Sequence, residues 1–424
     1  MACMSNGYGC GYGPIDWEFF KLFSMSGHAT THPSSMDTNT NFEIFLDDAI
    51  RDSRTKIEKG AEENDSSLRY PLFLTEIYLH WASTYYSHEI GHRQQYYNRG
   101  IYQLGVPLGS VWTPLVPKWD HKGDGNAFLT FDPYSHSRNT LGGLYQQELN
   151  SEYYFRKGVI DGDFDLDDAF AYLFNNAADV AYHVVFGPSF GDIRNTKKNY
   201  EHDFQKNINT DNWFALSVLT AMASARMWES LFLMEEYLRT GKAEARPLRI
   251  EVGGVAVYPP HISFFVGPLD YFMNIELPLK AKEYALFLNF GATLRDVARP
   301  ARPGARLFVP PVEVSAFVDL DSGGYVGGAY GLKADAFDAD GWKLSVAFLW
   351  HEGDYVFEDL FGYGLAHTYC EVCKCPPYET VREWQDNGSV LYNSPEWDEW
   401  HPEFIEKIER SAQRYFFISA LKNF

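Results

Sequence analysis

The spacing of apolar residues divides the chain into a helical first part and a β-rich second part. Between residues 70 and 240 apolar side chains recur with the period of an amphipathic helix. This spacing predicts helices over 70–98, from about 141, from about 167 and over 212–239. The last of these is apolar on most of its faces, so we expect it to be the central buried helix. One shorter helix is predicted over 42–59.

From residue 246 the period of the apolar residues changes to two. Alternating apolar and polar residues continue to residue 361, interrupted by turn signals such as Asp321-Ser322-Gly323-Gly324. This pattern predicts about seven or eight antiparallel strands, arranged as a β-sandwich or a barrel. We therefore expect an α+β fold that ends in a short helix over 402–421.

These changes of pattern predict four segments. Residues 1–68 are expected to form a flexible arm and the short helix, and residues 69–245 a helical domain. Residues 246–361 are expected to form the antiparallel β domain, and residues 362–424 a cysteine-containing tail with the final helix. No apolar run reaches the length of a transmembrane helix, and the first twenty residues lack the pattern of a signal peptide.

Charge and aromatic content narrow the classes of function. The chain has 36 basic and 57 acidic residues, which gives a net charge of −21. This balance argues against a nucleic-acid partner and against electrostatic docking on an anionic membrane, because both need basic surfaces. Aromatic residues make up 17% of the chain, which favours large buried side chains or amphipathic interfaces.

The motif His88-Glu89-Ile90-Gly91-His92 lies in the middle of the helix predicted over 70–98. Residues i and i+4 share one face of a helix, so His88 and His92 can bind the same zinc ion. Zinc lowers the pKa of a bound water to about 7, and Glu89 is placed to accept its proton. The sequence therefore predicts a zinc site with Glu89 as general base.

A catalytic zinc ion needs a third protein ligand, and the next helix carries Gln147-Glu148-Leu149-Asn150-Ser151-Glu152. The two motifs together resemble those of the gluzincin metallopeptidases, the thermolysin-like clan, in which the Glu of Asn-Glu-x-x-Ser-Asp is the third ligand. The resemblance covers about 65 of 424 residues and implies a zincin-like helical half with a peptide or protein substrate. It also implies that Glu148 binds zinc and that Glu152 orients a ligand histidine.

The chain departs from the family pattern at several positions, and 55 residues separate His92 from Glu148. The departures are Arg93, Gln94, Gln147 and Glu152. Competing third ligands are Glu152, His136, His121 and His183. A tyrosine or histidine near the metal normally stabilises the transition state of such a reaction, and the candidates are Tyr145, Tyr153 and His183.

Two further clusters carry ion-binding residue types. The alternating carboxylates of Asp161, Asp163, Asp165 and Asp167 are spaced as in a calcium loop. The alternative is an acidic loop in which Asp167 or Asp168 caps the following helix. The second cluster could bind zinc, form disulfides with partners such as Cys3 or Cys10, or stay free; its members are His367, Cys370, Cys373 and Cys375.

Two functions remain in competition. The leading interpretation is a zinc-dependent hydrolase, most simply a metallopeptidase. The alternative is a structural or binding component of a cell-envelope or surface assembly, with a metal site that is not catalytic. Segments such as 325–337 and 342–350 resemble hairpins of outer-membrane β-barrels, which favours an extracytoplasmic location in the periplasm or outer membrane of a bacterium. A homo-oligomer or an envelope partner would fit this alternative, whereas a soluble β domain would fit the zinc-dependent hydrolase.

Overall fold

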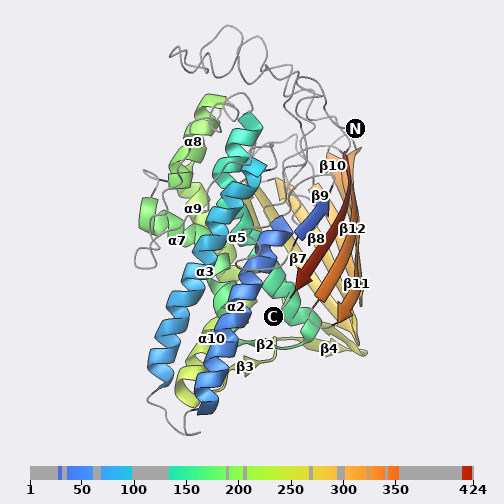
Figure 1. Cartoon of the computed structure of the whole chain (residues 1–424). Helices are drawn as coiled ribbons and strands as arrows, with labels where there is room; N and C mark the ends of the chain where they lie inside the picture. Colours follow the sequence, from blue (N-terminus) through green and yellow to red (C-terminus); the bar gives the residue numbers. More distant parts are fainter. Residues whose placement is uncertain are drawn as a thin grey trace.

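The computed structural model describes eleven segments of the chain, which together contain eight helices and one large antiparallel sheet. The segments are 27–30, 36–60, 68–97, 133–187, 191–203, 208–266, 271–293, 301–321, 324–339, 342–352 and 413–422. Helices lie on one side of the sheet (Figure 1), so the predicted α+β class is confirmed. The helices are α2 Met36–Gly60, α3 Arg69–Tyr97, α5 Pro133–Asp161, α6 Leu166–Asn176, α7 Ala178–Phe186, α8 Gly191–Asp203, α9 Thr210–Ala223 and α10 Ala225–Thr240.

The large sheet has the strand order β1-β13-β12-β11-β10-β9-β8-β7-β5-β4, and β6 pairs with β7 off this path. The path ends at β1 and β4, so the described strands form one open sheet rather than the predicted sandwich or closed barrel. A separate pair joins β2 Phe164–Asp165 to β3 Glu244–Ala245. The strands of the large sheet are β1 Gly27–Thr30, β4 Ile250–Val252, β5 Val255–Val257, β6 His261–Val266, β7 Tyr271–Ala281, β8 Tyr284–Thr293, β9 Ala301–Val309, β10 Val312–Asp321, β11 Gly324–Ala339, β12 Trp342–Glu352 and β13 Gln413–Lys422.

The C-terminal segment differs from the prediction of a final helix. Residues 413–422 form β13, which pairs antiparallel with β12 and places Phe416 opposite Phe348. The run Tyr415-Phe416-Phe417-Ile418 consists of aromatic and β-branched residues that fit a pleated strand, and the neighbouring strand decides between the two structures. Strand β1, from the predicted flexible arm, pairs with the other edge of β13.

The helix predicted over 212–239 is broken at Ser224 into α9 and α10. Ser224 has extended backbone angles (φ −73°, ψ 119°), and its buried hydroxyl lies 2.5 Å from that of Tyr172. This helix pair is not central either, because Leu219 is 62% exposed and Phe232 is 67% exposed. The helices predicted over 42–59 and 70–98 are confirmed by α2 and α3, whereas α7 and α8 were not predicted.

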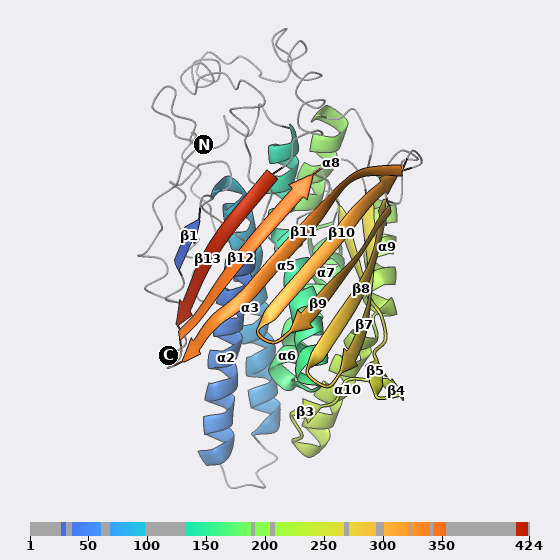
Figure 2. The same cartoon turned by 90° about the vertical axis from the view of Figure 1, so that its right-hand side faces the viewer.

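Helix α5 occupies the centre of the molecule, between α3 and the sheet (Figures 1 and 2). On its sheet side the Tyr145 hydroxyl donates to the carbonyl of Val266, at 2.9 Å. On its α3 side the two backbones touch at glycines, since a Cβ on Gly91 would lie 2.4 Å from the carbonyl oxygen of Gly142. This close approach brings the histidine motif of α3 against α5. In the described segments no helix is both long enough and apolar enough to span a membrane.

Candidate metal centre

Three potential ligand atoms converge where α3 meets the first turn of α8. The Nε2 atom of His88 lies 3.0 Å from Oδ2 of Asp192, and Nε2 of His92 lies 3.1 Å from the same oxygen. The two Nε2 atoms are 3.1 Å apart. Among the residues with described side chains, these three form the one group of histidine, cysteine, aspartate or glutamate residues that could hold a metal ion.

The geometry of this group fits a bound ion. Nitrogen and oxygen ligands lie about 2.0–2.2 Å from zinc, so two ligands of a tetrahedral ion are about 3.3–3.6 Å apart. The three distances in the group, 3.0 to 3.1 Å, are only slightly shorter. Ordinary hydrogen bonding does not require two imidazole nitrogens to face one carboxylate oxygen and each other. The arrangement could therefore hold a metal ion.

Gln147 of α5 orients the first histidine. The Nδ1 atom of His88 lies 2.9 Å from the amide oxygen Oε1 of Gln147. Because this oxygen can only accept, Nδ1 donates to it, and Nε2 is the nitrogen that can lose its proton and bind a metal. Metal-binding histidines usually have such a partner on their other nitrogen.

Packing fixes the ring of His88 on both faces. A Cβ on Gly143 would lie 2.4 Å from the ring, so α5 must carry a glycine here for its backbone to approach. Tyr182 of α7 stacks on the ring, with 5.2 Å between centroids and an interplanar angle of 21°. The His88 side chain is therefore held in one position before any metal binds.

Asp192 is held in its ionised form. Burial disfavours the charged carboxylate, but the charge of His92 and hydrogen bonds with both histidines lower the pKa of Asp192 well below its usual range. The Tyr182 hydroxyl also donates to Asp192, and burial together with this carboxylate raises the pKa of Tyr182. A carboxylate must be deprotonated to bind a metal ion, and this environment keeps Asp192 in that form.

Glu89 lies on the same turn of α3 as the first ligand, and 9% of its surface is exposed. The hydroxyl of Tyr85, one turn earlier, is hydrogen-bonded to Glu89, and burial followed by this carboxylate raises the pKa of Tyr85. Both Glu89 and Asp192 act on the pKa values of Tyr85 and Tyr182, so the two carboxylates and two tyrosines share one small region. The site thus contains a carboxylate beside the ligand set.

The expected third ligand, Glu148, is not part of the converging group. Its neighbour Gln147 faces His88, whereas Glu148 receives a hydrogen bond from the backbone N–H of Phe264 in β6. Burial, and then the charges of Glu152 and Asp179, raise the pKa of Glu148 well above its usual range. The carboxylate supplied by the structure is Asp192.

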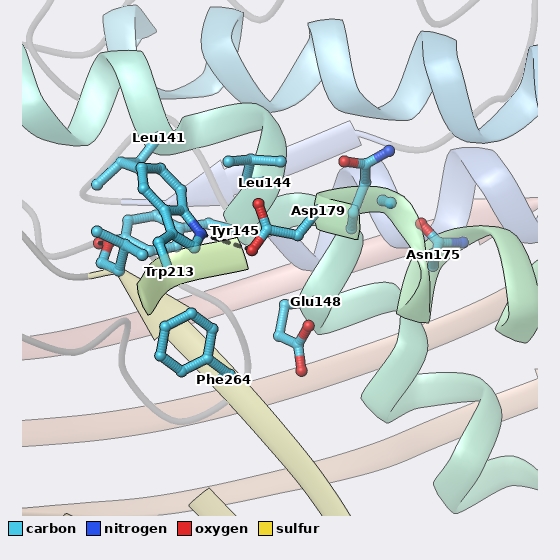
Figure 3. A pocket seen from close by; sticks show the side chains of 11 residues that line it. Leu141, Leu144, Tyr145, Glu148, Asn175, Asp179, Trp213 and Phe264 are labelled. Carbon is cyan, nitrogen blue, oxygen red and sulfur yellow. Dashed lines mark hydrogen bonds between the residues drawn. The ribbon is translucent and has the colours of Figure 1, made fainter. Parts of the chain in front are cut away.

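Glu148 lines a small internal cavity next to the ligand set (Figure 3). The cavity of about 20 Å³ has room for one water-sized molecule. Asp179 also lines it and accepts a hydrogen bond from the Trp213 indole, at 2.6 Å, and another from the Ser217 hydroxyl. Gln147 lines the cavity as well, so its amide connects the cavity to His88.

The other residues predicted to belong to the site make contacts away from His88 and His92. Glu152 accepts hydrogen bonds from Arg156 at 2.6 Å and from Ser263 at 3.2 Å, and orients neither histidine of the motif. His183 packs on Trp213, with 5.1 Å between ring centroids. Tyr145 bonds to the sheet, and Tyr153 lies in the core beside Tyr154. His121 and the side chain of His136 lie outside the described residues.

The acidic loop caps a helix. Asp165 is the N-cap of α6 and accepts from the backbone N–H of Asp168 at 2.8 Å, a role predicted for Asp167 or Asp168. Asp165 also pairs with Arg51, and Asp167 pairs with Arg54 at 2.5 Å. Asp161 and Asp163 are exposed. The predicted cluster at 367–375 lies outside the described residues, as do Cys3 and Cys10.

Comparison of the chain with protein-family models, with curated proteins and with solved structures finds no match. The function must therefore be argued from the site. Four members of the site were not identified from the sequence: Asp192, Tyr85, Tyr182 and the orienting Gln147. Gln147 had a local signal, because it adjoins the predicted ligand, but nothing near Asp192 distinguishes it from the other aspartates of the chain.

Proposed function

We propose that the chain is a zinc-dependent hydrolase in which His88, His92 and Asp192 bind the metal. The observation that supports this most directly is the convergence of two Nε2 atoms and one Oδ2 atom within 3.1 Å of one another. Two imidazoles and one carboxylate, with a position left for water, are a ligand set of catalytic zinc sites. The same donors also suit Fe(II), so the metal itself must be measured.

Each nearby side chain has a task in this proposal. A bound zinc ion supplies a Lewis acid and lowers the pKa of water. Glu89 accepts the proton of the attacking water, and Tyr85 donates to Glu89 and holds its carboxylate in place. Gln147 fixes the tautomer of His88, and Tyr182 holds Asp192.

A peptide or protein is the substrate class that we favour. The support is the motif His88-Glu89-x-x-His92 on a helix, because this arrangement places a base beside a metal that can polarise an amide carbonyl. The gluzincin resemblance is kept for the first motif, while Asp192 replaces Glu148 as the proposed third ligand.

The metal part of the proposal is tested by elemental analysis of the purified full chain. We expect about one zinc per chain in the wild type, and a loss of at least about 100-fold in zinc affinity for Asp192→Ala. Glu148→Ala is the matched control, since it removes a buried carboxylate on α5 outside the group, and should retain zinc. Iron instead of zinc, or loss of metal in Glu148→Ala alone, would contradict the assignment.

The catalytic part is tested with Glu89→Gln, a variant that keeps the shape of the side chain. Hydrolysis of a mixed peptide library should fall by about 100- to 10,000-fold while the zinc content stays unchanged. The second candidate function, a structural metal in an envelope or surface assembly, is favoured by the burial of His88, which is 1% exposed. It predicts that the wild type hydrolyses nothing above background and that Glu89→Gln matches it in every property.

A further inference from the structure

The face of the large sheet that the helices cover mixes polar with apolar side chains, among them the core residues Ala285 and Phe287, whereas the outer face is apolar. On β8, β9 and β10 the positions that face the helices include Asn289, Arg302 and Ser315, which are at most 5% exposed. The alternate positions face away from the helices and are apolar. Six large side chains at such positions, with exposed fractions between 37% and 54%, are Leu288, Phe290, Leu307, Val314, Leu320 and Leu332.

The strand register aligns these apolar positions into rows. One row runs from Leu279 through Leu286, Leu307, Val314 and Leu332, strand after strand from β7 to β11. Backbone pairing continues the same row to Phe348 of β12 and Phe416 of β13. Figure 2 looks onto this outer face, with the helices behind it. From β7 to β11 the outer face is therefore apolar, and no described element covers it.

Two ion pairs of the sheet lie on the face toward the helices. Arg156 of α5 binds Glu276 of β7 at 3.0 Å, and Arg306 binds Glu313 at 3.2 Å. None of the outward positions of β8, β9 and β10 carries a charged residue. An uncharged partner is the only kind that such a face complements without burying unpaired charge.

The dimensions of the strands match one uncharged partner, the hydrocarbon layer of a lipid bilayer. A tilted strand needs about 9–11 residues to cross this layer. β7, β8, β9, β10, β12 and β13 have 9 to 11 residues, and β11 has 16. The lengths of these strands therefore match the thickness of the hydrocarbon layer.

We propose that the outer face of β7–β11 contacts the acyl chains of a lipid bilayer. Tyr284, 43% exposed at the turn end of β8, has the amphipathic character of residues at the rim of a bilayer. Since the chain carries a net charge of −21, binding should be driven by apolar contact and should prefer zwitterionic to anionic lipid.

A second copy of the chain is the competing occupant. Five strands of about ten residues present a face of roughly 800 Å² on each copy, which is enough for a face-to-face dimer. A dimer does not explain why the strands share the length that spans a bilayer. The lipid assignment is therefore the one that we test. It uses no residue of the metal centre and does not depend on the proposed function.

The first experiment uses the wild-type full chain reconstituted into phosphatidylcholine vesicles that contain a phospholipid with a diazirine in its acyl chain. After illumination, mass spectrometry of peptides should find the label on outward residues such as Phe290, Leu307 and Val314. Peptides carrying only inward residues should remain unlabelled. Absence of label from β8 to β11, or label confined to helices, would overturn the proposal.

The second experiment introduces charge into the row. Val314→Arg combined with Leu332→Arg places two cations at paired positions that are 45% and 47% exposed. Val184→Arg is the control, at a position 71% exposed on α7. The fraction of protein that floats with phosphatidylcholine vesicles should fall at least about tenfold for the double variant and stay unchanged for the control.

Circular dichroism tests whether both variants fold. If the double variant does not fold, the photolabelling of the wild type still tests the proposal. Sedimentation of the wild type in vesicle-free buffer completes the test. A stable dimer that the double variant converts to monomers, together with no vesicle binding by the wild type, would assign the face to a second copy and refute the lipid proposal.

Discussion

Two histidines on the same helix, eight positions apart, show the difference between a structural environment and a candidate metal-binding one. His80 lies between two carboxylates, with Nδ1 2.9 Å from Asp47 and Nε2 3.2 Å from Asp167. His88 has an amide oxygen on Nδ1 and shares the single oxygen of Asp192 with His92. Both rings are buried. Burial and the number of polar partners are therefore similar for the two histidines. They differ in where the partners lie: on opposite sides of the His80 ring, but converging with His92 on one point at His88.

The environment of His80 stabilises its charged form. Burial disfavours the imidazolium, but the charge of Asp47 and the hydrogen bonds to both aspartates raise the pKa of His80 to about 10. A ring that donates from both nitrogens has no lone pair for a metal. The group around His88 instead points three acceptor or ligand atoms at one place. The comparison teaches that a metal centre is recognised by convergence rather than by the number of polar neighbours.

The largest expected effect is on stability at the structural histidine. His80→Gln removes the cation between Asp47 and Asp167, so we expect the free energy of unfolding to fall by about 3–5 kcal/mol. His88→Gln should cost less, about 1–3 kcal/mol, when both proteins are freed of metal with a chelator. Urea unfolding followed by circular dichroism measures both values. Equal losses would show that the two environments do not differ as described.

The pH dependence of stability should separate the two sites further. The pKa of His80 is raised from 6.5 in the unfolded chain to about 10 in the folded protein. The stabilisation by His80 is therefore complete below about pH 6.5 and is lost as the pH rises through about 10. Subtracting the unfolding free energies of His80→Gln from those of the wild type at each pH should reveal this decline. A difference that stays constant across this range would contradict it.

Two neighbouring glutamines give a matched pair with a smaller effect. Gln147→Leu removes the partner of His88 and should lower zinc affinity by about 10- to 100-fold. Gln146→Leu removes a different buried amide, which donates to Asn150 at 2.8 Å, and should leave zinc affinity unchanged. Competition with a zinc-binding dye measures both. An equal loss in the two variants would assign the effect to general destabilisation of α5.

The smallest expected effect concerns the hydroxyl of Tyr182. Tyr182→Phe keeps the ring on His88 but removes the hydrogen bond to Asp192, so zinc affinity should fall by about tenfold or less. The same dye competition detects it. A loss above about 100-fold would indicate that the hydroxyl itself acts on the metal or on its bound water.

The histidine pair was predictable because its geometry is local. Four residues along a helix bring His88 and His92 to one face, and this holds in the structure. The third ligand depends on where α8 packs, which no local pattern encodes. Glu148 failed for a simple reason: one residue corresponds to about 100° around a helix, so Gln147 faces α3 while Glu148 faces β6.

The sheet was predictable in kind but not in orientation. Alternation of apolar and polar residues identified the strands, because side chains of a strand point to opposite faces. The same alternation does not say which face the helices cover. Here the helices cover a face that combines core residues such as Phe287 with the pair of Arg156 and Glu276, and the apolar positions of the other face lie outside. This arrangement becomes visible only when both layers are placed.

The glycine contact between α3 and α5 gives a means of finding related chains. Gly91 and Gly142 bring the two backbones together, and Gly143 admits the ring of His88. A chain with the same centre therefore needs the pattern His-Glu-x-Gly-His on one helix and Gly-Gly-x-x-x-Gln on the next, with an aspartate at the start of a later helix. A search with this spaced signature would detect distant homologues whose overall sequences have diverged beyond alignment.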